Sequence, residues 1–161
     1  MIDHATDQKL LHRTIKISQA ARDSGNTPFG ALLADQNGEI LMEQGNIELT
    51  EHICTGHAEC TLAARASHKY SKADLWQYSL YTTAEPCVMC AGAIYWANIG
   101  RVVYAMEERR LLQLTGSNDV NPTFDLPTRE IYRHGQKNIT VVGPFKELEV
   151  QAAAVHQGYW D

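Results

Sequence analysis

Hydrophobic positions near the N-terminus first follow helical spacing and then form two short runs. Apolar residues recur near helical spacing over the segment 7–24, which predicts an amphipathic helix. The runs 29–34 and 39–45 flank the pair Asn37-Gly38, a dipeptide typical of tight hairpin turns. The chain is therefore expected to open with one helix followed by two antiparallel strands.

The rest of the chain alternates between helix-like and strand-like segments. Helices are predicted at 57–67, 86–97, 107–114, 128–133 and 145–156, strands at 76–83, 101–105 and 138–142, and loops at 46–56 and 115–127. The second loop is long enough to suggest a functional role. Strands that alternate with helices after an opening hairpin predict an α/β protein, a three-layer α/β/α sandwich with a mixed five-stranded sheet.

Composition favours one compact domain over residues 1–161. Hydrophobic residues make up 44% of the 161 positions and charged residues 20%, as in soluble globular proteins. No secretory signal and no apolar run of membrane-spanning length is found, so a cytoplasmic location without membrane contact is expected. The formal net charge of -5 disfavours a nucleic-acid partner, because affinity for phosphate is built largely from Lys and Arg.

Two short segments combine the residue types of a zinc site. The triplet 57–59 (His-Ala-Glu) opens one predicted helix, and the segment 87–90 (Cys-Val-Met-Cys), preceded by proline, opens another. If these helices pack side by side, their N-termini bring together His57, Cys87 and Cys90. Three protein ligands leave a fourth position open to water, as in catalytic zinc sites. Helix N-termini also favour negative charge, which helps to keep both cysteines as thiolates.

Glu59 is the expected general acid and base, because it lies near the metal without being obliged to ligate it. His-x-Glu followed later by Pro-Cys-x-x-Cys is the signature of zinc-dependent nucleobase deaminases. A thioredoxin-like redox fold competes for the Cys-x-x-Cys pair, but it needs no distant His-x-Glu. A structural zinc site closed by Cys54 or Cys60 is a second alternative, although it leaves Glu59 without a role. Otherwise both cysteines are expected to be small buried hydrophobic residues.

With these motifs the chain resembles bacterial purine-type deaminases of the cytidine deaminase superfamily, a group that includes guanine deaminases and tRNA adenosine deaminases. The resemblance covers about residues 7–142 and is carried by the segments 28–31 (Pro-Phe-Gly-Ala), 57–59 and 85–97. It implies the α/β/α fold, one Zn2+ ion per chain and a homodimer. The C-terminal helix and tail, about 145–161, are candidates for exchange between the subunits.

The same resemblance implies a set of substrate-binding residues, which are Phe29, Asn46, Ala58, Trp96, Asp119 and Tyr159. Asn46 would hydrogen-bond the base, Asp119 would contact the base or relay protons, and Tyr159 would close the pocket. The backbone N–H of Cys87 or of Ala58 would hold polar atoms of the substrate, as helix N-termini generally do. For Trp96, packing in the core or at a subunit interface is the alternative.

The expected activity is hydrolytic deamination of an aminated purine, with guanine converted to xanthine and ammonia as the favoured reaction. A tRNA adenosine deaminase would need a basic groove, whereas the segment 145–150 (Phe-Lys-Glu-Leu-Glu-Val) is net negative. Asn26-Thr27 stands where guanine deaminases commonly have Gly-Gly, so the base itself stays open. A cytosine- or cytidine-type deaminase is a further candidate, and so is a non-catalytic zinc module that binds a partner protein.

Overall fold

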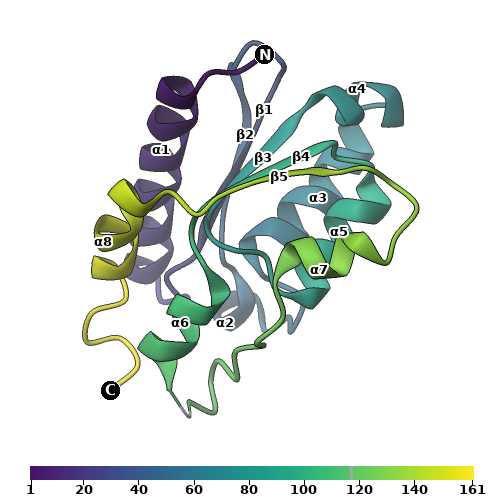
Figure 1. Cartoon of the computed structure of the whole chain (residues 1–161). Coiled ribbons are helices and arrows are strands. Elements are labelled where there is room, and N and C mark those ends of the chain that lie inside the picture. The colour runs from purple at the N-terminus through teal and green to yellow at the C-terminus, as the bar shows by residue number, and fades with distance from the viewer. Residues whose placement is uncertain (117) are drawn as a thin grey trace.

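The computed structural model describes residues 1–116 and 118–161, which form a five-stranded sheet with helices on both faces (Figure 1). The strand order is β2-β1-β3-β4-β5. The strands are β1 (Gly30–Ala34), β2 (Ile40–Gly45), β3 (Ser79–Ala84), β4 (Arg101–Met106) and β5 (Thr140–Val142). β1 runs antiparallel to β2 and to β3, whereas β3, β4 and β5 run parallel to one another. The predicted mixed sheet is confirmed.

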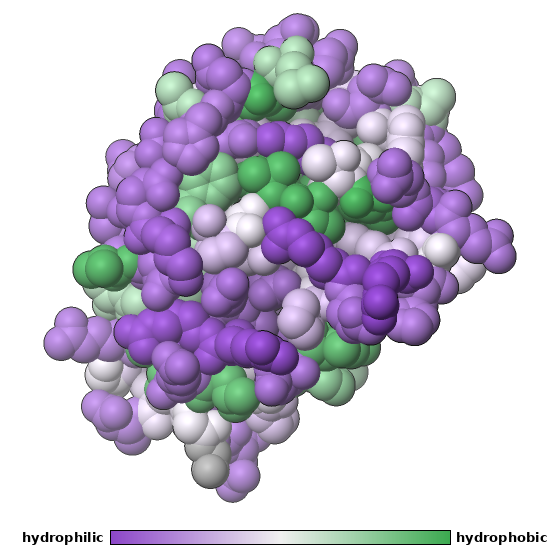
Figure 2. All heavy atoms as spheres, in the orientation of Figure 1, coloured by the Kyte–Doolittle hydropathy of each residue, from purple (hydrophilic) through white to green (hydrophobic). Residues whose placement is uncertain are grey.

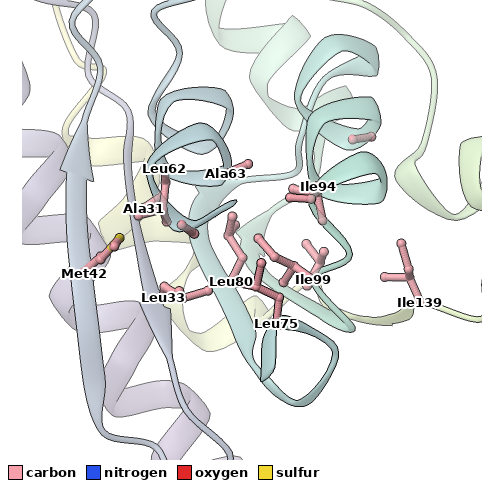
Figure 3. Packing of buried hydrophobic residues seen from close by; sticks show 14 of the residues in the cluster. Ala31, Leu33, Met42, Leu62, Ala63, Leu75, Leu80, Ile94, Ile99 and Ile139 are labelled. Atoms are coloured by element: carbon pink, nitrogen blue, oxygen red, sulfur yellow. The ribbon is translucent and has the colours of Figure 1, made fainter. Parts of the chain in front are cut away.

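Helices cover both faces of this sheet. They are α1 (His4–Asp23), α2 (Glu48–Glu51), α3 (Ala58–Lys69), α4 (Lys72–Gln77), α5 (Val88–Ala97), α6 (Glu108–Thr115), α7 (Thr128–Arg133) and α8 (Lys146–Ala154). One apolar cluster joins α1 and α8 to the sheet, and a second joins α3 and α5 to its other face. Figure 3 shows Leu33 and Leu80 of the sheet gathered with Leu62 of α3 and Ile94 of α5. β1 and β3 are buried along their whole length because both of their faces are covered.

Two short helices differ from the sequence-based expectation. α2 lies inside the predicted loop 46–56, and a helix of four residues is too short to carry a hydrophobic period. α4 replaces the start of the strand predicted at 76–83, which begins instead at Ser79. The Ser71 side chain caps α4 by accepting a hydrogen bond from the Asp74 N–H, and this Ser-x-x-Asp pattern is visible in the sequence.

The C-terminal ends of β3 and β4 lie next to each other and lead into α5 and α6. Because the two strands are parallel, the helices that follow them begin at the same edge of the sheet. Residues 118–127 lead from this region into α7 (Figure 1). Polar groups at the beginnings of α5 and α6 therefore lie close together at this edge of the sheet.

The side of the molecule drawn in Figure 2 is mostly hydrophilic, and its hydrophobic residues form small groups. Over the described ranges, 1–116 and 118–161, no helix combines the length and the apolar character needed to span a membrane.

Candidate active site

Three side chains meet where α3 and α5 begin. His57 is the N-cap residue of α3, Cys87 is the N-cap residue of α5, and Cys90 lies in the first turn of α5. The His57 Nδ1 atom lies 3.7 Å from the Cys87 Sγ and 3.6 Å from the Cys90 Sγ. A tetrahedral zinc ion, with Zn–S near 2.3 Å and Zn–N near 2.0 Å, separates such ligand atoms by about 3.5 Å. The spacing and the chemistry of these donors therefore fit zinc.

No fourth protein ligand joins this group in the part of the chain that the structure describes. Cys54 and Cys60, the two candidates for closing a structural site, are not members of it. Cys54 is exposed and Cys60 is half-buried, so the expectation that both are buried is wrong. A set of three ligands with an open position is the arrangement of a catalytic zinc site.

Hydrogen bonds within this group favour the negatively charged thiolate form of Cys87. A hydrogen bond from Cys90 lowers the pKa of Cys87 to about 4 against the opposing effect of burial, and a hydrogen bond with His57 contributes further. The same pairing with Cys87, together with burial, raises the pKa of Cys90 well above its ordinary value. Cys87 is therefore a thiolate at neutral pH, which is the form of cysteine that binds zinc.

Glu48 lies behind His57 on the side away from the two cysteines. Its Oε2 atom is 3.2 Å from the His57 Nε2, and both side chains are half-buried. A carboxylate in this position orients a metal-binding imidazole and raises its basicity. Glu48 was not predicted from the sequence, because only the folding of α2 brings this residue to the histidine.

Glu59 lies in the first turn of α3 and is only 5% exposed. The Thr82 hydroxyl donates a hydrogen bond of 2.9 Å to its Oε1, and the Cys90 Sγ lies 3.6 Å from its Oε2. Burial, followed by the negative charge of Cys87, raises the pKa of the Glu59 carboxyl. A raised pKa suits a group that must both accept and return a proton near neutral pH.

The ligand group faces a cavity of about 250 Å³, which is smaller than typical pockets for drug-sized ligands. Its apolar walls come from Phe29, Met89, Leu111, Val120, Pro122 and Phe124. Its acidic side chains are Glu48, Glu59, Glu85 and Glu108. Among residues 1–116 and 118–161, no Lys or Arg lines it. The cavity therefore suits a small ligand that carries no negative charge.

Of the predicted substrate-binding residues Phe29, Asn46 and Ala58, only one lines the cavity. Phe29 forms part of the wall. Ala58 is fully buried as the first residue of α3. The side chain of Asn46 is buried, and its Oδ1 accepts a hydrogen bond of 2.9 Å from the Glu48 N–H. Asn46 therefore holds the start of α2, and its contact with a substrate stays a prediction.

The other three predicted residues do not line the cavity of their own chain. Trp96 is 74% exposed on α5, beside Tyr95. Asp119 is exposed in the loop after α6. The Tyr159 ring lies 5.4 Å from the guanidinium carbon of Arg22. Contact of these residues with the substrate, from their own subunit or from a partner, stays a prediction, as does the homodimer.

The fold and the site together define a zinc-dependent deaminase. Residues 4–106 match the family described as the cytidine and deoxycytidylate deaminase zinc-binding region. The chain belongs to this family, and the resemblance found in the sequence is confirmed.

Comparison with known proteins adds relatives with different substrates. The chain is 37% identical to a probable cytosine deaminase of Schizosaccharomyces pombe over 155 residues, which cover 96% of this chain and 93% of the relative. It is 37% identical to the guanine deaminase of Bacillus subtilis over 101 residues, 62% of this chain and 64% of the relative. The solved guanine deaminase of Nitrosomonas europaea has a TM-score of 0.74 at 22% identity, over 93% of this chain and 82% of that one, which supports the fold.

Proposed function

We propose that this protein deaminates a free, uncharged nucleobase by hydrolysis, with cytosine as the leading substrate. The observation that carries the proposal is the cavity beside the zinc ligands, which is small and is lined by four glutamates and, within the described residues, by no Lys or Arg. A nucleotide or an RNA strand would bring phosphate groups, whose binding relies on Lys, Arg and similar donors. An acidic lining that offers no Lys or Arg within the described residues disfavours such substrates and accepts a neutral base.

The choice of cytosine rests on the extent of similarity. One relative that aligns with nearly the whole chain is a probable cytosine deaminase. Guanine, favoured by the sequence motifs, is the second candidate, because a guanine deaminase matches 62% of the chain at the same identity. Asp119 and Trp96, two of the residues assigned to guanine, lie outside the cavity lining.

The proposed reaction converts cytosine and water to uracil and ammonia. Zinc held by His57, Cys87 and Cys90 would lower the pKa of a bound water towards neutrality. Glu59 accepts a proton from the attacking water and delivers it to N3 of the base. It then takes the proton of the hydroxyl group added to C4 and delivers it to the amine, which leaves as ammonia while C4 becomes a carbonyl. The hydrogen bond from Thr82 to the Glu59 Oε1 leaves the Oε2 directed towards Cys90 and the metal ligands. The apolar wall around Phe29 keeps other water away from the base.

The test is ammonia release by zinc-loaded protein from cytosine, guanine, adenine, cytidine and deoxycytidylate, each measured separately. We expect a free base to react, with kcat/KM for cytidine and deoxycytidylate lower by about 100-fold or more, since an unmatched polar or charged group is rejected strongly. Reaction of guanine alone would keep the free-base proposal and change the base. Faster reaction of deoxycytidylate, or of a tRNA anticodon stem-loop, would contradict it. Failure of every substrate while zinc is bound would favour the non-catalytic zinc module.

A further inference from the structure

Three of the four glutamates in the cavity have partners that explain their positions. Glu48 lies against the His57 imidazole, and Glu59 accepts a hydrogen bond from Thr82. Glu85 accepts hydrogen bonds from the backbone N–H groups of Thr128 at 2.7 Å and Glu108 at 3.1 Å. Only the side chain of the fourth, Glu108, has no such explanation.

Glu108 is the first residue of α6 and is 2% exposed, yet it lines the cavity. Its Oε2 atom is buried and has no hydrogen-bond partner within residues 1–116 and 118–161. Burial, followed by the negative charges of Cys87 and Glu85, raises the pKa of Glu108 to about 9. A buried polar atom without a partner costs stability, and an apolar side chain at this position would avoid that cost. The missing partner is therefore expected on the ligand.

We propose that Glu108 accepts a hydrogen bond from a ring N–H of the substrate and thereby selects free bases over their N-substituted forms. This inference rests on the proposed function. It concerns a substrate-binding residue, and it assigns Glu108 no part in the transfer of protons.

The position of the N1–H group in cytosine determines where its hydrogen-bond acceptor must lie. In cytosine, N1 lies opposite C4, the carbon that loses the amine. When C4 faces the zinc ligands and N3 faces Glu59, the N1–H group points across the cavity towards another wall. α6 contributes another wall, because Glu108 and Leu111 of this helix line the same cavity as Cys87. In cytidine N1 carries ribose, so it has no hydrogen to donate and the sugar would meet Glu108. The same holds for N9 of guanine and guanosine.

The experiment compares cytosine with 1-methylcytosine, which lacks only the N1–H group. Glu108→Met removes both carboxyl oxygens at similar length, and Glu108→Gln keeps an acceptor oxygen. Glu107→Met is the matched control, because its carboxylate lies at the surface, 3.9 Å from Lys146 Nζ.

We expect Glu108→Met to lower kcat/KM for cytosine by about 10- to 100-fold, mainly through KM, as the loss of one hydrogen bond from a buried polar group predicts. For 1-methylcytosine the change should stay within about threefold, because that compound never made the bond. Glu108→Gln should keep most of the preference for cytosine over 1-methylcytosine. Glu107→Met should match the wild type in kcat/KM for both compounds. Glu108→Met should also raise the melting temperature, whereas loss of a merely structural residue would lower it and affect both compounds alike.

An unchanged ratio between cytosine and 1-methylcytosine in Glu108→Met, with cytosine still deaminated, would overturn the role of Glu108 and leave the proposed function standing. If guanine is the base that reacts, guanine and 9-methylguanine give the same comparison. If the wild-type protein deaminates no free base, the proposed function fails, and the inference about Glu108 fails with it.

Discussion

Glu48 lies outside the group formed by His57, Cys87 and Cys90, yet it contacts the imidazole of His57. Its carboxylate lies 3.2 Å from the His57 Nε2 and is held by α2, whose first turn is fixed by the Asn46 side chain. With Nε2 facing the carboxylate, Nδ1 is the ring nitrogen that faces Cys87 and Cys90. The carboxylate thus favours the ring orientation that binds metal.

Glu48→Gln is expected to weaken zinc binding by about 10- to 100-fold, because the amide supports the imidazole less well than the carboxylate does. Zinc affinity is measured by competition with a chelator of known affinity. Glu51→Gln, an exposed position on the same helix, should bind zinc like the wild type. Equal affinity in Glu48→Gln and the wild type would show that His57 is oriented without Glu48.

The residues of the site differ in how well the sequence predicts them. The candidate zinc ligands His57, Cys87 and Cys90 could be predicted because each stands at or near a helix N-terminus within a short motif. Glu48 and Glu108 could not be, since their roles arise from contacts between elements that are distant in the sequence. Local spacing indicates which residues share a helix turn. It does not indicate that a carboxylate from a different helix, such as Glu108, lines the same cavity.

At the scale of elements, Glu85 joins three segments at the edge of the sheet that carries the site. It follows β3 directly and is 5% exposed. Its two oxygens accept hydrogen bonds from the backbone at the starts of α6 and α7. These bonds satisfy N–H groups that have no partner within their own helices.

Glu85→Ala is expected to lower the free energy of unfolding by about 3 kcal/mol, since it leaves two buried N–H groups without an acceptor. Urea unfolding measures the change. Glu107→Ala, a surface substitution at the residue that precedes α6, should change the free energy of unfolding by less than about 0.5 kcal/mol. A loss below about 1 kcal/mol in Glu85→Ala would mean that water replaces the carboxylate at little cost.

The order and type of the longer elements could be predicted from periodicity, whereas the short helices could not. α1, α3 and α5 each contain enough turns for an apolar stripe or a run of helix-forming residues to be recognised. α2 has a single turn, and its packing beside His57 is a tertiary effect. The site depends on α2, so the contact between Glu48 and His57 could be recognised only in the structure.

At the scale of the whole molecule, the C-terminal tail folds back onto the wall of the cavity. The Trp160 indole N–H donates a hydrogen bond of 3.1 Å to the His156 Nδ1. The His156 ring meets the edge of Phe29, a cavity residue, with 5.2 Å between ring centroids. The tail thus packs on its own chain here, and its exchange within a dimer stays a prediction.

Burial of His156 gives stability a specific dependence on pH. Burial, and secondarily the positive charge of Arg22, lowers the pKa of His156 to about 4. A histidine in the unfolded chain has a pKa of about 6.5, so the unfolded state binds more protons between these values. The contribution of His156 to the free energy of unfolding is therefore fully present above about pH 6.5 and is lost as the pH falls towards 4.

Between pH 7 and pH 5, the wild type is expected to lose about 2 kcal/mol more stability than His156→Phe. The free energy of unfolding is measured by urea titration at both pH values, with the same zinc content throughout. His134→Phe, at a side chain that is 74% exposed, should follow the wild type. Parallel losses in the wild type and His156→Phe would contradict the assigned pKa.

The three-layer fold could be predicted as a whole, but the character of its cavity could not. Alternation of strands and helices specified the layers and the parallel half of the sheet. The lining depends on where α6 and residues 120–124 come to rest against the zinc ligands. The sequence left the base open, and we propose that this lining takes part in selecting it.

We propose that Glu59 moves protons beside a zinc ion held by His57, Cys87 and Cys90. The most direct test measures zinc content and ammonia release from cytosine and guanine in Glu59→Gln and in the wild type. We expect one zinc ion per chain in both proteins and a fall in kcat of about 100- to 10,000-fold in the variant. A variant that keeps its zinc and still deaminates at the wild-type rate would contradict the role of Glu59.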